Sequence, residues 1–146
     1  MRAIPPVKFI SPLDRESFTE HRLGNYVDLD PRTDIIRDWK GGSVTYDGHD
    51  GIDFGAPHFA QMDEGQPVVA AADGVVVSVD DVGFDRNVGT LDNITPGGPP
   101  NIVRIDHGQG WQTIYIHLRR DSIRVQPGQS VQAGERIGWE GSSGDS

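Results

Sequence analysis

Two short segments of this chain follow the same pattern, and this repeat constrains the fold more than any other feature. Residues 65–70 (GQPVVA) and 128–133 (GQSVQA) each start with glycine and enter an apolar run, and a glycine turn with a second apolar run follows each. Two such β units are typical of a barrel or sandwich formed by duplication, whereas two copies are too few for a solenoid. The repeat therefore predicts a mainly β, antiparallel domain.

The composition agrees with this prediction and excludes some partners. Of 146 residues, 19 are Gly, 10 are Pro and only 35% are hydrophobic, a mixture that favours short strands joined by tight turns. The formal charge of −9 argues against nucleic acid or an anionic membrane surface as the main partner. No apolar run approaches the length of a membrane span. With no cysteine in the chain, disulfides and Cys-ligated zinc are excluded.

The composition of the chain changes near residue 46. Residues 1–45 are polar and rich in proline, and we expect an irregular N-terminal arm there with one helical turn over residues 34–39. The first ten residues lack the continuous apolar core of a signal peptide. Residues 46–146 are expected to form the β domain.

Several strands are predicted within residues 46–146. Residues 68–79 contain two β-branched runs around a turn at Asp73 and Gly74. Residues 101–106 and 111–117 predict a hairpin, in which alternation puts Ile102, Arg104 and Asp106 on one face and Val103 and Ile105 on the other. Residues 80–100 are rich in Asp, Gly, Asn and Pro and are expected to form a long loop.

His49 and Asp53 form a candidate pair of metal ligands. In a flat strand the two residues would lie ~13 Å apart, at ~3.3 Å per residue, and the intervening Asp50 and Gly51 are poor helix formers. A bend at Gly51 would let both side chains reach one metal ion. Taken alone, His-x-x-x-Asp is a weak motif, because many proteins contain it without binding metal.

The blocks around this pair, in their order and spacing, resemble the lysostaphin-like (LytM-type) zinc metalloendopeptidases, which cut peptidoglycan cross-bridges. The resemblance covers about two thirds of the chain, from Tyr46 onward, and implies a duplicated-hybrid-motif, barrel-sandwich fold. It rests on residues 46–57 (YDGHDGIDFGAP), 65–76 (GQPVVAAADGVV), 101–108 (NIVRIDHG), 113–118 (TIYIHL) and 125–138 (VQPGQSVQAGERIG).

The resemblance implies a role for three residues. His49 and Asp53 would be zinc ligands, and the metal would polarise the peptide carbonyl and acidify a bound water. His117 would be a catalytic residue that transfers a proton or stabilises the oxyanion. The substrate would be a peptidoglycan peptide, which places the parent protein in the periplasm or outside the cell.

The family's third zinc ligand comes from a His-x-His pair after a glycine-rich turn that resembles residues 141–146 (GSSGDS). The printed sequence stops in that turn, so we expect this chain to be incomplete at its C-terminus and inactive as it stands. His58 is expected at the surface and His107 in a turn, and we see no role for His21, so none of the three is expected to substitute.

Three other classes of function compete with the peptidase. A non-catalytic relative that binds peptidoglycan or regulates a hydrolase is the main alternative, although retention of His49, Asp53 and His117 argues against it. A lipoyl or biotin carrier needs a modifiable lysine at a hairpin tip, and the only lysines, Lys8 and Lys40, lie outside the predicted strands. A sugar-transport domain with a phosphorylated histidine does not explain Asp53.

Overall fold

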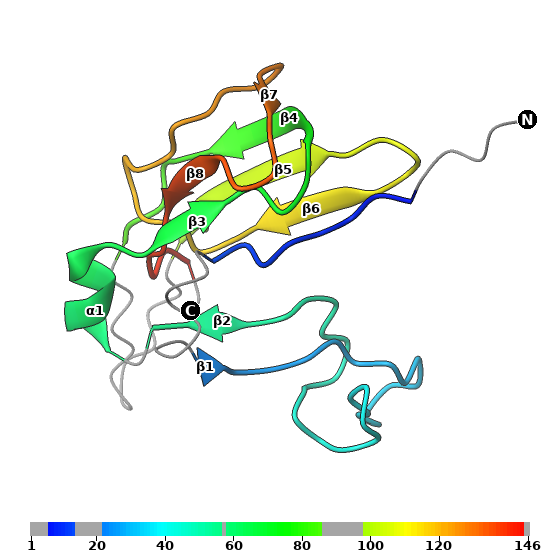
Figure 1. The fold of residues 1–146 in the computed structure, drawn as a ribbon. Coiled ribbons are helices and arrows are strands. Elements are labelled where there is room, and N and C mark those ends of the chain that lie inside the picture. Colours follow the sequence, from blue (N-terminus) through cyan, green and yellow to red (C-terminus); the bar gives the residue numbers. More distant parts are fainter. Residues whose placement is uncertain (1–5, 14–21, 57, 86–97, 145–146) are drawn as a thin grey trace, which may run out of the picture. The chain divides into compact units, whose positions relative to one another are not determined.

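The computed structural model describes residues 6–13, 22–56, 58–85 and 98–144 (Figure 1). The chain divides into two compact units, one of Met1–Glu16 with Met62–Ser146 and the other of Ser17–Gln61. His21 and residues 86–97 of the predicted long loop lie outside the described residues. The division into an arm over residues 1–45 and a domain over residues 46–146 stays a prediction.

The larger unit is built from two antiparallel sheets, which confirms the predicted mainly β fold. In Figure 1 these strands lie close together in the upper part of the view. The four-stranded sheet has the order β6 (Gln112–Tyr115), β5 (Ile102–Asp106), β4 (Gly74–Asp80) and β7 (Ser130–Val131), and the two-stranded sheet pairs β3 (Pro67–Val69) with β8 (Arg136–Trp139).

The two copies of the sequence repeat exchange their strands. The first strand of each copy is β3 or β7, and the second is β4 or β8. β3 pairs with β8 of the other copy, and β7 pairs with β4 of the other copy. Val68 and Val131, at the same position of the repeat, are both buried. The two strands of one copy therefore do not pair with each other, and each copy needs the other to complete its sheets.

The predicted hairpin is present in the centre of this unit. β5 and β6 pair in antiparallel register, with Val103 opposite Tyr115 and Ile105 opposite Thr113. Val103 and Ile105, which the alternation places on one face, are both fully buried. They form the core together with Val76, Leu118 and Ile137.

The turn at Asp73 and Gly74 joins two strands that belong to different sheets. A Cβ atom on Gly74 would lie 2.5 Å from the carbonyl oxygen of Asp106, at the end of β5. Glycine is required there because the backbones of β4 and β5 approach each other so closely. Ala133 N donates a hydrogen bond to Asp73 Oδ1 at 2.8 Å, which ties this turn to the end of the second copy.

The smaller unit contains β1 (Arg22–Leu23) and β2 (Phe54–Gly55), which pair in antiparallel register. The helical turn predicted over residues 34–39 is wrong: these residues form turns and irregular backbone, and Asp34 has a φ of 63°. α1 (Phe59–Glu64) is the helix present among the described residues, and the sequence reading missed it. No helix within those residues has the length and apolar character needed to span a membrane.

Candidate metal-binding and proton-transfer residues

His49 and Asp53 lie together in the smaller unit. His49 Nε2 is 3.1 Å from Asp53 Oδ1, and the chain between the two residues bends at residue 51. Gly48 adopts a φ of 74°, whereas Gly51 does not have a positive φ. The chain thus curls between the two residues as expected, but the left-handed glycine is the one that precedes His49.

A backbone carbonyl fixes which nitrogen of His49 carries hydrogen. His49 Nδ1 is 2.8 Å from the carbonyl oxygen of Tyr26, and a carbonyl only accepts hydrogen bonds. Nδ1 therefore donates, and Nε2 is the ring nitrogen that faces the Asp53 carboxylate. Two acceptor atoms this close require a proton or a metal cation between them. His49 is buried while Asp53 is 46% exposed, so this place is open on one side.

The donors of this pair fit part of a zinc site. In a tetrahedral zinc site with bonds of about 2.1 Å, two ligand atoms lie ~3.4 Å apart, close to the 3.1 Å between Nε2 and Oδ1. Imidazole nitrogen and carboxylate oxygen are common zinc ligands in hydrolases. Within the described part of the chain, no three His, Cys, Asp or Glu residues gather into a group that could hold a metal ion.

Residues 25 and 26, in the region predicted to be an arm, support both members of the pair. Asn25 Nδ2 donates to Asp53 Oδ2 at 2.8 Å, and Asp53 N donates to the carbonyl oxygen of Asn25 at 2.9 Å. The carbonyl of Tyr26 orients His49. Sequence reasoning missed both residues, since the backbone carbonyl of Tyr26 has no signature in the sequence and the Asn25 amide is 28 residues from Asp53.

The ring of Tyr46 covers one face of His49. The two rings stack with centroids 4.3 Å apart and planes 24° apart. Partial burial raises the pKa of the Tyr46 hydroxyl, and the charges of Asp53 and Asp50 raise it further. Tyr46 therefore stays a neutral hydroxyl beside the two carboxylates, and its ring restricts the rotation of the imidazole.

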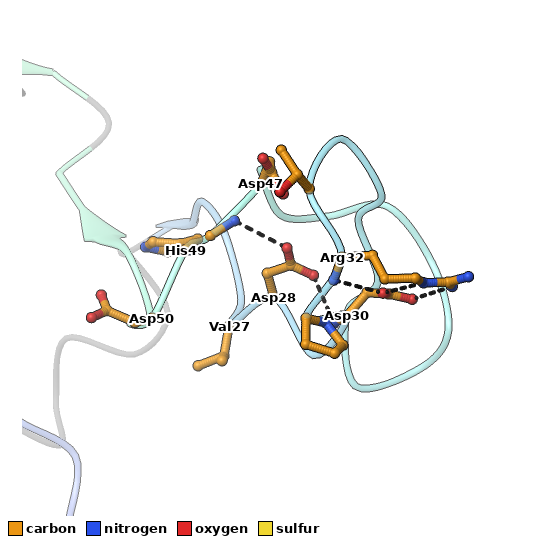
Figure 2. Close-up of a pocket in the computed structure, with 10 residues that line it drawn as sticks. Val27, Asp28, Asp30, Arg32, Asp47, His49 and Asp50 are labelled. Carbon is orange, nitrogen blue, oxygen red and sulfur yellow. Dashed lines mark hydrogen bonds and ion pairs between the residues drawn. The ribbon is translucent and has the colours of Figure 1, made fainter.

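A pocket of about 390 Å³ adjoins His49, and Figure 2 shows its lining. The Asp28 carboxylate accepts hydrogen bonds from the backbone N–H groups of Asp30, Arg37 and Gly48, which lower its pKa. The Asp30 carboxylate binds the Arg32 guanidinium at 2.8 Å, and this bond lowers the pKa of Asp30. Both carboxylates thus hold the loop over residues 28–48 in shape.

His117 lies in the larger unit, just after the end of β6. The strand stops at Tyr115, and His117 has a φ of 62°. The alternation of a strand therefore does not extend to His117, and it does not place the side chains of Tyr115 and His117 on one face. His117 Nδ1 donates to the carbonyl oxygen of Ser143 at 2.6 Å. In the neutral imidazole, the Nε2 atom of His117 then carries the lone pair. A non-glycine residue with positive φ is uncommon, and such residues are enriched at functional sites.

Tyr115, His107 and His58 have structural contacts. Tyr115 is buried, its hydroxyl oxygen accepts a hydrogen bond from Ala71 N at 2.8 Å, and burial raises its pKa. Both nitrogens of His107 are engaged, Nδ1 at 2.9 Å from the carbonyl oxygen of Asp73 and Nε2 at 2.7 Å from Thr113 Oγ1. His58 is exposed, and its Nδ1 accepts from Gln61 N at 3.1 Å.

The chain belongs to peptidase family M23, whose model matches residues 47–146. This membership confirms the family that the sequence blocks predicted. A metal is implied, because the family is a peptidase family and a relative of the chain is named a metalloprotease.

Curated bacterial relatives match the same region. The chain is 34% identical to an "uncharacterized metalloprotease" of Haemophilus influenzae over 96 residues, 66% of this chain and 16% of that protein. It is 38% identical to the DD-carboxypeptidase/endopeptidase Mpg of Neisseria meningitidis over 98 residues, 67% of this chain and 17% of that protein. Identity to the peptidoglycan DD-endopeptidase ShyA of Vibrio cholerae is 36% over 96 residues, 66% of this chain and 17% of that protein. The chain thus spans about one sixth of the length of these relatives.

Proposed function

We propose that this chain contributes to the active centre of a zinc-dependent endopeptidase that cleaves peptide cross-links of peptidoglycan. The observation that carries the proposal is the His49–Asp53 pair, in which Nδ1 of His49 is bound to the Tyr26 carbonyl and Nε2 lies 3.1 Å from Asp53 Oδ1. Membership of peptidase family M23 and the names of its endopeptidase relatives support the reaction and the substrate class.

In this proposal, His49 holds the metal through Nε2 and Asp53 holds it through Oδ1. Zinc, when bound, supplies a polarised substrate carbonyl and a water of lowered pKa. The Tyr26 carbonyl and the Asn25 amide orient the two ligands from behind, and contacts of this kind increase metal affinity. The neutral imidazole and the single carboxylate suit zinc better than calcium or magnesium, which prefer oxygen ligands alone.

His117 is proposed to act on the proton and the charge of the reacting group. Its Nδ1–H is committed to the Ser143 carbonyl, so Nε2 accepts a proton from the attacking water or, once protonated, donates a hydrogen bond to the oxyanion. The half-buried position of His117 favours this role, since a hydrogen bond is stronger where water is partly excluded.

A peptidoglycan substrate implies where the protein acts, because peptidoglycan lies outside the cytoplasmic membrane. We therefore propose a periplasmic or extracellular site of action. Residues 46–146 are proposed as the peptidase domain, with residues 1–45 as an arm whose Asn25 and Tyr26 support the metal ligands.

The test is hydrolysis of purified peptidoglycan by the zinc-loaded full-length protein, with new peptide ends identified by mass spectrometry. We expect cleavage of cross-links, its loss in His49→Ala and Asp53→Ala, and its retention in His58→Ala, which removes an exposed histidine of the same unit. Absence of cleavage together with retained binding to peptidoglycan would contradict the proposal and favour a non-catalytic relative.

A further inference from the structure

Two fully buried polar side chains, Asn101 and Ser143, meet next to His117. Asn101 N donates to Ser143 Oγ at 2.9 Å, and Ser143 Oγ donates to the carbonyl oxygen of Leu118 at 2.7 Å. Asn101 Nδ2 donates to the same carbonyl at 3.0 Å. Both side chains have 0% exposure, so each bond is formed away from water. Unpaired, these groups would each carry the cost of desolvation.

Asn101 extends this cluster to a third segment of the chain. Its Oδ1 atom accepts from Gly83 N at 2.6 Å, and its Nδ2 donates to the carbonyl oxygen of Gly83 at 3.2 Å. Leu118 N donates to the carbonyl oxygen of Asn101 at 3.2 Å, so the backbone at Leu118 is bonded through both its N–H and its C=O. Asn101 therefore fixes the residue that follows His117.

The cluster accounts for the left-handed backbone of His117 and for the hydrogen bond of its Nδ1 atom. The left-handed φ of 62° is unfavourable for histidine, and the bonds at Leu118 hold the chain in that conformation. Ser143 acts twice, because its hydroxyl binds Leu118 while its carbonyl accepts from His117 Nδ1 at 2.6 Å. The Leu118 backbone and the carbonyl that binds the imidazole thus both belong to one buried cluster.

We propose that Asn101 and Ser143 are positioning residues, which hold His117 as the Nδ1–H tautomer with its Nε2 lone pair available. The meaning of this arrangement for catalysis rests on the proposed function, in which Nε2 moves the proton. The positioning itself is a property of the chain as it stands, and it is measured without substrate or metal.

The experiment is ¹⁵N NMR of the His117 ring nitrogens, at a pH where the imidazole is neutral, in the wild-type chain and in two matched variants. Ser143→Ala removes a hydroxyl that donates to Leu118 and accepts from Asn101. Ser122→Ala is the control: Ser122 is also buried, and its hydroxyl donates to the Arg119 carbonyl at 2.7 Å and accepts from Trp139 N at 3.1 Å. The two variants lose the same number and kind of bonds, but only Ser143 bonds to His117.

We expect a single Nδ1–H tautomer in the wild-type chain and in Ser122→Ala. Ser143→Ala keeps the carbonyl that binds Nδ1 but loses the hydroxyl that anchors this carbonyl's residue to Leu118, so the ratio of Nδ1–H to Nε2–H should fall, by up to roughly fivefold, the weight of one ordinary hydrogen bond. The Nε2–H tautomer in the wild type would overturn the proposal without any variant. An unchanged ratio in Ser143→Ala, or an equal fall in Ser122→Ala, would also overturn it. A wild-type protein that shows the expected tautomers but has no peptidase activity would count against the proposed function alone.

Discussion

At the scale of single residues, three histidines are each oriented by a backbone carbonyl that binds Nδ1. Their roles differ in what the other ring nitrogen, Nε2, contacts. The carbonyls of Tyr26, Ser143 and Asp73 bind Nδ1 of His49, His117 and His107 respectively. His107 Nε2 is bonded to Thr113, whereas His49 Nε2 faces a carboxylate. Local contacts thus distinguish a structural histidine from a candidate ligand better than sequence spacing does.

The Asn25 amide gives a prediction about the metal ligands. Asn25→Ala removes the hydrogen bond to Asp53 Oδ2, so the carboxylate is no longer held in one orientation. We expect zinc affinity, measured by titration calorimetry, to fall about tenfold, the effect usual for losing an outer partner of a ligand. His58→Ala serves as the matched control and should leave affinity unchanged. Equal affinities for wild type and Asn25→Ala would show that Asp53 needs no support from Asn25.

The backbone at His117 gives a second prediction. Because its φ is 62°, glycine should be favoured over alanine at this position by about 1 kcal/mol in the free energy of unfolding. At the exposed neighbour Ile116, which has no positive φ, alanine should be the more stable of the two. Urea denaturation of the four variants measures both differences. The same order at both positions would contradict the assigned conformation.

At the scale of elements, Gly74 is a point where β4 closely approaches the end of β5. Gly74→Ala would place a methyl group 2.5 Å from the Asp106 carbonyl oxygen, and relief of this overlap should cost about 2 kcal/mol of stability. Gly55→Ala is the matched control, because its Cβ meets nothing within 4 Å and its φ is not positive. Thermal unfolding that lowers Tm equally in both variants would argue against the close approach.

The sequence predicted elements whose signals are local. The hairpin over residues 101–117 follows from period-two alternation around a glycine turn, and the repeat predicted paired β units. It did not predict that β6 ends at Tyr115, because the left-handed His117 depends on Asn101 and Ser143, which are distant in sequence.

The helical turn predicted near residue 38 failed for a different reason. Within residues 34–39, Arg37 N donates to Asp28 Oδ1 and Asp38 N donates to the carbonyl oxygen of Gly42, so these amides are bonded to acceptors outside the turn and not to carbonyls four residues earlier. The contacts of Asn25 and Tyr26 with the metal pair were equally hidden, since they join segments more than 20 residues apart.

At the scale of the whole molecule, the two units should differ in their response to acid. Asp28, Asp30 and Asp38 lie in the Ser17–Gln61 unit, and hydrogen bonds from backbone N–H groups or Arg32 lower the pKa of each below the ordinary 3.8. Because the folded-state pKa values are depressed, their stabilisation is complete above about pH 4 and is lost as pH falls through those values.

Hydrogen exchange measures this difference. Between pH 4 and pH 2 the protection factors of the Gly42 and Val44 amides, which bind Asp38, should fall more than that of Val103 in the core of the larger unit. In Asp38→Asn the acid dependence at Gly42 and Val44 should be much reduced. A parallel fall at Val103 would indicate that the loss of protection is not specific to these carboxylates.

The central claim, that His49 and Asp53 hold zinc together, is tested most directly by a zinc titration followed by ¹⁵N NMR of the histidine rings. The account predicts that zinc perturbs His49 Nε2 first, that the Asp53 side-chain carbonyl resonance moves with it, and that His107 and His58 stay unchanged. The His49 response should disappear in Asp53→Ala. A His49 signal that zinc leaves unmoved, or a stronger response at His107 or His58, would contradict the claim.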